Sequence, residues 1–145
     1  MTRLAKFRAL SPRDRKIVLR ALATLWRTWF LLRFTNFANV HALANGPAIG
    51  VARLDSPSPI RIALAVGGAG FLVPGGSNCL IRAIAAGMML RRYGYDSALM
   101  IGVAKSPEGG LNAHAWLESA GQIVIGDFEL DRFVPLDTHR PVAAS

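Results

Sequence analysis

The sequence lacks a second cysteine, an apolar N-terminal segment and a long apolar run free of glycine and proline. Cys79 alone excludes an internal disulfide framework and any metal cage built from several cysteines. The longest uncharged run, residues 62–81, is broken by five glycines and a proline, which is typical of a loop and a helix start. Six Lys and Arg among the first sixteen residues exclude a secretory signal. These absences predict a protein of a reducing compartment, soluble or bound at a membrane surface.

The composition is that of a folded domain with an unevenly placed positive charge. The chain has 145 residues, 52% hydrophobic and only 18% charged, which excludes a disordered chain and predicts a single domain with its own core. Residues 1–35 hold nine of the seventeen Lys and Arg and one acid, Asp14, so this segment alone accounts for the net charge of +8. Such a segment suits nucleic acid, anionic lipid or an acidic peptide as a partner.

A long helix is predicted near the N-terminus. Ser11 is a typical N-cap, Pro12 suits the first helical position, and the apolar periodicity continues from Arg13 to about Phe34. The apolar stripe contains Val18, Leu22, Leu25, Trp29 and Leu32, and it is widened by Trp26, Phe30 and Phe34. The helix either packs on the core with a solvated basic face or binds a membrane surface or a partner.

The basic face of this helix has a regular spacing. Arg13, Arg20 and Arg27 repeat every seven residues on the side opposite the apolar stripe, which makes them candidates for binding a peptide or a partner protein.

The middle of the chain carries weaker signals. Residues 35–60 are predicted to be loop around a short element, and residues 60–66 form either a short helix or a strand. Gly67–Ser77 resembles a phosphate-binding loop, but Gly76 stands where the essential lysine would be. This difference excludes nucleotide binding.

Cys79 is the first candidate catalytic residue. The pattern from Cys79 to Arg92 predicts a helix, which Ser77 or Asn78 can cap and Gly94 can end. In the first turn, unpaired backbone N–H groups and the positive end of the helix dipole favour thiolate over thiol. The alternative is that Cys79 is a small core residue.

His114 and Asp127 complete a possible triad. After a strand over residues 97–103, the runs 113–119 and 122–127 predict a hairpin that turns at Ala120-Gly121. In a regular hairpin His114 then lies opposite Asp127, on the face that also bears Trp116 and Ile125. A carboxylate there would orient the imidazole and leave its other nitrogen for Cys79.

Other interpretations of these residues stay open. A structural histidine and a surface aspartate fit the same pattern, and a one-residue register slip would separate their faces. If the strand bulges, Glu129 or Asp131 replaces Asp127. His41 and His139 have no partner pattern around them, and the spacing of Cys79, His114 and Asp127 does not favour a metal site.

Several short motifs follow one another along the second half of the chain. They are Cys79-Leu80-Ile81-Arg82-Ala83, Arg91-Arg92-Tyr93-Gly94, Ile101-Gly102-Val103, Ala113-His114-Ala115-Trp116-Leu117-Glu118, Gly121 and Phe133-Val134-Pro135-Leu136. With these motifs, residues 61–136, about half of the chain, resemble the lasso-peptide leader peptidases, stand-alone B-type processing proteases within the transglutaminase-like branch of papain-type cysteine proteases. The Ala-His-Ala-Trp-Leu-Glu segment after a Cys-Leu helix is the most specific of these motifs.

The resemblance implies an α+β fold, in which an N-terminal helical segment precedes a Cys-bearing helix packed on a small antiparallel sheet with His and Asp. It implies Cys79 as nucleophile, His114 as general base and Asp127 as orienting acid, with Glu129 and Asp131 as its competitors. The Cys79 backbone N–H, and more weakly the Asn78 side chain, are candidate oxyanion donors. No cofactor and no metal are expected.

We divide the chain into three parts within a single domain. Residues 1–60 form the basic helix and a loop that packs on or extends the core, residues 61–137 form the transglutaminase-like core, and residues 138–145 form a tail. Only sixty residues precede the core, without the strands that begin a winged-helix leader-recognition module. The sequence therefore predicts the stand-alone protease of a split system.

The resemblance implies a bacterial cytoplasmic enzyme that hydrolyses a ribosomally made precursor at its leader–core junction. Its expected partners are the precursor peptide, a separate winged-helix leader-recognition protein and the lasso cyclase, with peripheral membrane contact left open and nucleic acid not favoured. Two alternatives are kept. One is a noncatalytic basic adaptor for a membrane surface or nucleic acid, and the other is a transglutaminase-like acyltransferase that uses the same triad.

Overall fold

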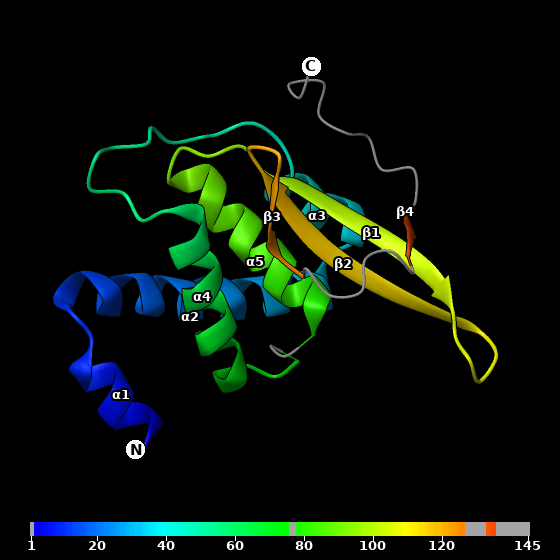
Figure 1. Ribbon diagram of the computed structural model, residues 1–145, viewed down its shortest axis with the longest axis horizontal. Coiled ribbons are helices and arrows are strands. Elements are labelled where there is room, and N and C mark those ends of the chain that lie inside the picture. The colour runs from blue at the N-terminus through cyan, green and yellow to red at the C-terminus, as the bar shows by residue number, and fades with distance from the viewer. Residues whose placement is uncertain (1, 76–77, 127–132, 136–145) are drawn as a thin grey trace.

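The computed structural model describes residues 2–75, 78–126 and 133–135. Helices lead into an antiparallel sheet in an α+β fold, as predicted (Figure 1). The helices are α1 (Arg3–Ala9), α2 (Pro12–Phe34), α3 (Phe37–Ala44), α4 (Pro59–Ala69), the short 3-10 helix η1 (Gly70–Leu72) and α5 (Cys79–Arg92). The strands are β1 (Ala98–Lys105), β2 (Leu111–Ser119), β3 (Gln122–Ile125) and β4 (Val134–Pro135).

Helix α2 begins where the sequence predicts, and its most buried row overlaps the predicted apolar stripe at Leu25. The Ser11 hydroxyl accepts a hydrogen bond from the Asp14 backbone N–H at 3.1 Å, which caps the helix. The row that faces the core consists of Ile17, Ala21, Leu25 and Thr28. Its small Ala21 and Thr28 side chains allow close approach of neighbouring helices. Leu25 belongs to both this row and the predicted stripe. The other stripe residues lie beside the row and are only partly buried: Val18, Leu22, Trp29 and Leu32.

The aromatic residues that were predicted to widen the apolar stripe point outward. Trp26, Phe30 and Phe34 are 37%, 51% and 73% exposed. They contact one another instead, with ring centroids 6.4 Å apart for Trp26 and Phe30 and 6.0 Å apart for Phe30 and Phe34. Periodicity locates the apolar sector of the helix but not the residues on which the other helices pack.

Two segments with weak sequence signals are helices. The short element within residues 35–60 is α3, which Asn36 caps, and the segment left open between helix and strand is α4, which Ser58 caps. Helix α4 lies across α2 in Figure 1, and its buried Ile62 and Val66 belong to the common core.

Helix α5 is the centre of the fold and spans the predicted residues, Cys79–Arg92. It contacts α2, α3 and α4, and also strands β1, β2 and β3. Ile84, Ala85 and Leu90 are fully buried along it. Its two ends therefore lie at opposite sides of the core, and each end reaches the surface.

The sheet has the order β3-β2-β1-β4 and is antiparallel. The predicted hairpin turns at Ala120-Gly121, where both residues have positive φ and Ser119 pairs with Gln122. Farther from the turn the predicted register is wrong, because Leu117 pairs with Ile125 rather than with Val124. One extra residue in β3 makes this bulge. Counting from the turn therefore no longer assigns a partner to His114, and Asp127 lies outside the described residues.

Candidate active site

A cavity of about 360 Å³ opens at the N-terminal end of α5 and is lined by both Cys79 and His114. Its walls come from α4, α5, β2 and the end of β3. The remaining lining residues are Ile60, Ala63, Leu64, Gly67, Arg82, Val124, Ile125 and Gly126. The fold thus brings together two chemically competent side chains that are far apart in the sequence, and it surrounds them mostly with apolar groups.

Cys79 is the first residue of α5 and is half-buried. Asn78 caps the helix, and its Oδ1 accepts a hydrogen bond from the Leu80 backbone N–H at 2.8 Å. Within the described residues, no acceptor pairs with the Cys79 backbone N–H. This N–H is therefore free to donate to a ligand, as expected at the start of a helix.

The cap also decides what Asn78 can contribute. Its side-chain oxygen is engaged by Leu80, whereas the amide nitrogen of the same exposed side chain is a donor. The two candidate oxyanion donors, the Cys79 backbone N–H and the Asn78 amide nitrogen, therefore belong to the reacting residue and to the residue directly before it.

His114 is oriented by a backbone carbonyl. Its Nε2 lies 2.7 Å from the carbonyl oxygen of Gly126. Because a carbonyl oxygen only accepts, Nε2 carries the proton in the neutral ring, and Nδ1 keeps its lone pair to act as a base. The imidazole also packs against the rings of Trp116 and Phe133, with centroids 6.2 Å and 5.2 Å away.

The sequence analysis missed the role of Gly126. This residue has φ of 83°, and a Cβ there would lie 2.7 Å from the Ala115 carbonyl oxygen and 2.9 Å from the Trp116 Cβ. Only glycine fits this conformation and this space. The available signal was a glycine that directly follows the apolar run Ile123–Ile125. The other expected orienting groups, Asp127, Glu129 and Asp131, lie outside the described residues.

The two side chains share a cavity without being bonded to each other. Among the described residues, no hydrogen bond joins the Cys79 thiol to the His114 ring. Catalytic hydrogen bonds are often long without substrate and tighten when it binds.

The structure separates the other candidate residues from this cavity. His41 lies on α3, where its ring contacts Phe37, and burial lowers its pKa. His139 lies outside the described residues. Arg13 and Arg20 line a second cavity, which Arg27 does not reach.

The described part of the chain lacks both a cluster of metal ligands and a membrane-spanning helix. No three His, Cys, Asp or Glu side chains there come together to hold a metal ion. Nor is any helix in that part both long enough and apolar enough to cross a membrane.

Comparison with known proteins gives one match. A family model described as the transglutaminase-like superfamily matches residues 18–138, a range that contains both Cys79 and His114. No curated protein and no solved structure matches the chain.

Proposed function

The chain belongs to the transglutaminase-like superfamily, and from this premise we propose that it is a cysteine peptidase that removes the leader from a ribosomally made lasso-peptide precursor. The observation that carries the proposal is the cavity shared by Cys79, at the start of α5, and His114 on β2. A thiol and an imidazole in one cavity are what nucleophilic acyl chemistry requires. The leader–core junction as the target rests on the resemblance of residues 61–136.

In the first half of the reaction, His114 Nδ1 takes the proton of the Cys79 thiol. The sulfur attacks the carbonyl carbon of the junction, and the negative oxygen of the intermediate accepts hydrogen bonds from the Cys79 backbone N–H and the Asn78 amide nitrogen. When the C–N bond breaks, His114 returns its proton to the leaving amine, and the leader stays bound to Cys79 as a thioester.

In the second half, His114 accepts a proton from a water molecule that attacks the thioester. The products are the free leader carboxylate and the restored Cys79 thiol, so no cofactor enters the cycle. In both halves, the Gly126 carbonyl accepts the hydrogen bond from His114 Nε2–H, which leaves Nδ1 free to accept and return the proton. Ile60, Leu64 and Val124 line the cavity and offer apolar surface to the substrate.

The proposal includes three partners. The precursor is the substrate, a separate winged-helix recognition protein holds its leader, and an ATP-dependent cyclase closes the freed core amine onto a side-chain carboxylate. The recognition protein would present the leader–core junction to the cavity and so raise the effective concentration of the junction there.

The deciding experiment is cleavage of the full-length precursor encoded near this gene, followed by mass spectrometry, with and without the recognition protein. We expect cleavage at one junction that requires Cys79 and is strongly stimulated by the recognition protein. Full-speed cleavage by the chain alone would reject the split system.

The same experiment separates the alternatives. Transfer of the leader to an added amine, in preference to water, would indicate an acyltransferase. Binding to anionic vesicles or DNA without any cleavage would indicate an adaptor.

A further inference from the structure

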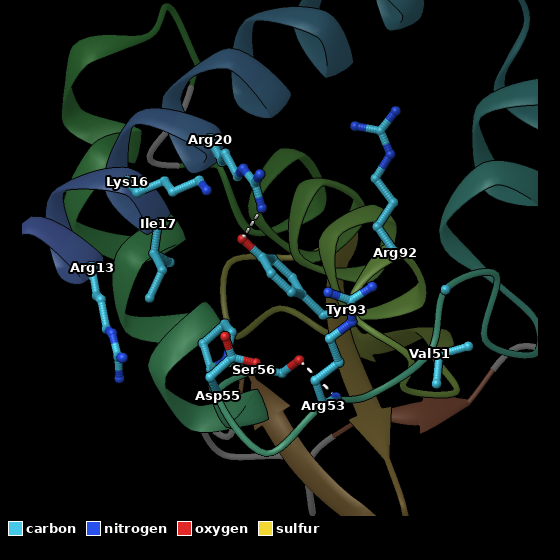
Figure 2. Close-up of a pocket in the computed structure, with 12 residues that line it drawn as sticks. Arg13, Lys16, Ile17, Arg20, Val51, Arg53, Asp55, Ser56, Arg92 and Tyr93 are labelled. Carbon is cyan, nitrogen blue, oxygen red and sulfur yellow. Dashed lines mark hydrogen bonds between the residues drawn. The ribbon is translucent and has the colours of Figure 1, made fainter.

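A second and larger cavity, of about 650 Å³, lies between α2, the segment that precedes α4, and the C-terminal end of α5 (Figure 2). Five of its lining residues are cations and one is a carboxylate, Asp55, so the lining has a net formal charge of +4. The cations are Arg13, Lys16 and Arg20 of α2, Arg53, and Arg92 at the end of α5. They come from three separate segments, and only the folded chain brings them together.

In the described part of the chain, no ion pair neutralises these positive charges. In the described ranges, the ion pair is between Arg61 and Asp14, and none of the five cavity cations forms one. All five are exposed. Arg20 is held in place by Tyr93, because its Nη1 donates to the hydroxyl at 2.8 Å and its guanidinium lies 5.6 Å from the ring centroid (Figure 2). Like charges around one cavity repel, and an anionic ligand relieves that repulsion.

The segment that carries Arg53 is fixed rather than loosely attached. The backbone N–H groups of Ile49 and Gly50 both donate to the Arg91 carbonyl, at 2.8 Å and 2.9 Å. The Arg53 backbone N–H donates to the Ser56 hydroxyl at 2.9 Å, as Figure 2 shows. The cavity therefore exists before a ligand arrives, which reduces the entropy cost of binding.

The position of this cavity connects it with the candidate active site. Cys79 and Arg92 are the two ends of α5, which places them about 20 Å apart along the helix axis. A third cavity, of about 300 Å³, shares Ile17 with the basic cavity and Leu64 with the Cys79 cavity. Leu10, Val18 and Ala65 give it an apolar wall, and the ion pair of Arg61 with Asp14 also lines it. This third cavity, over α2 and α4, therefore adjoins each of the other two.

We propose that the basic cavity binds acidic side chains of the peptide substrate, at least about six residues from the bond that is cleaved. This inference rests on the proposed peptidase function and names the substrate feature that the enzyme recognises. Because α5 is buried between its two ends, the peptide passes over α4 and α2 and needs more than this minimum length, and its apolar side chains fill the third cavity. A flat lipid surface would not enter a concavity of this kind, and a small anion would leave the apolar cavity empty.

The test measures binding separately from cleavage. Fluorescence anisotropy is recorded with the Cys79→Ala chain and a labelled peptide of about twelve residues that carries two adjacent glutamates at one end. The matched peptide has glutamine in their place. We expect the glutamate peptide to bind about tenfold more tightly, with an advantage that disappears at high salt.

Paired variants locate the site. Arg53→Gln/Arg92→Gln removes two cavity charges and should weaken binding of the glutamate peptide about tenfold, without changing that of the glutamine peptide. Arg33→Gln/Lys105→Gln removes two exposed charges outside the cavity and should change neither. Equal binding of the two peptides, or an equal loss in both double variants, would overturn the proposal.

Two further arms identify the source of the anion and separate this proposal from the peptidase function. If Arg53→Gln/Arg92→Gln loses affinity for phosphatidylglycerol vesicles but not for the glutamate peptide, the ligand is a lipid surface and the proposal is wrong. If the glutamate peptide binds as expected but the unmodified chain cleaves no precursor, the acidic-peptide cavity stands and the peptidase function fails.

Discussion

The two ends of α5 carry two cavities of contrasting chemistry. At the N-terminal end, Cys79 and His114 lie among mostly apolar side chains, and Arg82 is the cation of that lining. At the C-terminal end, five cations surround a larger cavity. A reaction that creates charge gains most from fixed donors in a poorly hydrated space, whereas recognition of a charged segment needs accessible opposite charge. One helix therefore separates candidate catalysis from candidate recognition by about 20 Å.

The largest effect is expected from removing the reacting groups at the N-terminal end. Cys79→Ala and His114→Ala should each lower precursor cleavage by roughly 10⁴-fold or more, and the double variant should be no worse than either, because the two act as a unit. Cleavage is followed by mass spectrometry, and thermal unfolding should show that Cys79→Ala keeps its fold. Cleavage by Cys79→Ala at an unchanged rate would end the peptidase assignment.

The next largest effect tests the acid that the resemblance implies as a further orienting group for His114, beside the Gly126 carbonyl. Asp127→Asn should reduce cleavage by about 10²-fold, less than loss of His114, because an amide still orients the ring in part. Glu129→Gln and Asp131→Asn are the matched neutral changes, and both should be mild. If Asp131→Asn proves the severe variant, the predicted partner of His114 is wrong while the mechanism stands.

Gly126 tests whether the backbone carbonyl positions His114. Gly126→Ala places a Cβ at positive φ and against Ala115 and Trp116, which should cost about 1–3 kcal/mol of folding free energy and reduce cleavage. Gly121→Ala is the control, because its φ is 76° but nothing lies within 4 Å of the added Cβ. Urea unfolding and cleavage rates are measured for both. Equal loss of cleavage in the two variants would exclude a specific role for Gly126.

Two adjacent arginines sharpen the comparison at the other end of α5. Arg91 donates to the carbonyls of Ala42, Leu43 and Pro47, so Arg91→Gln should destabilise the fold by about 1–3 kcal/mol. Arg92 lines the basic cavity, and Arg92→Gln should change folding stability by less than about 0.5 kcal/mol. Urea unfolding at neutral pH measures both. Equal destabilisation would make Arg92 a structural residue.

The smallest effect belongs to His41, which lies outside both cavities. Burial keeps the pKa of His41 below its ordinary value of 6.5, and its Nε2 is buried without a partner in the described structure. The unfolded chain therefore binds a proton before the folded chain does, so this contribution to stability is present above pH 6.5 and is lost as the pH falls. The urea midpoint should fall less steeply with decreasing pH in His41→Gln than in the unmodified protein. The same pH dependence of the midpoint in both proteins would contradict the prediction.

Local sequence signals were sufficient for α2, α5 and the hairpin, whereas α1 and β4 were not predicted. Ser11 and Asn78 cap α2 and α5, and Ala120-Gly121 turns the hairpin, because each feature depends on hydrogen bonds and backbone preferences within a few residues. The residues of the α5 helix agree with the sequence analysis, and Cys79 and His114 both line one cavity. The short apolar pattern of α4 fits both a helix and a strand, so the sequence did not decide between them.

The sequence by itself determined the start of α2, the extent of α5 and the turn of the hairpin, and it predicted Cys79 and His114 as candidate catalytic residues. Only the tertiary structure decided which face of α2 is buried, where β3 bulges, and that Gly126 orients His114. It also brought Arg53 and Arg92 to the basic cavity beside Arg13 and Arg20. The physical reason is the separation along the chain of the residues that interact. Caps and turns involve neighbouring residues, whereas buried faces, bulges and cavities depend on side-chain packing between segments that are distant along the chain.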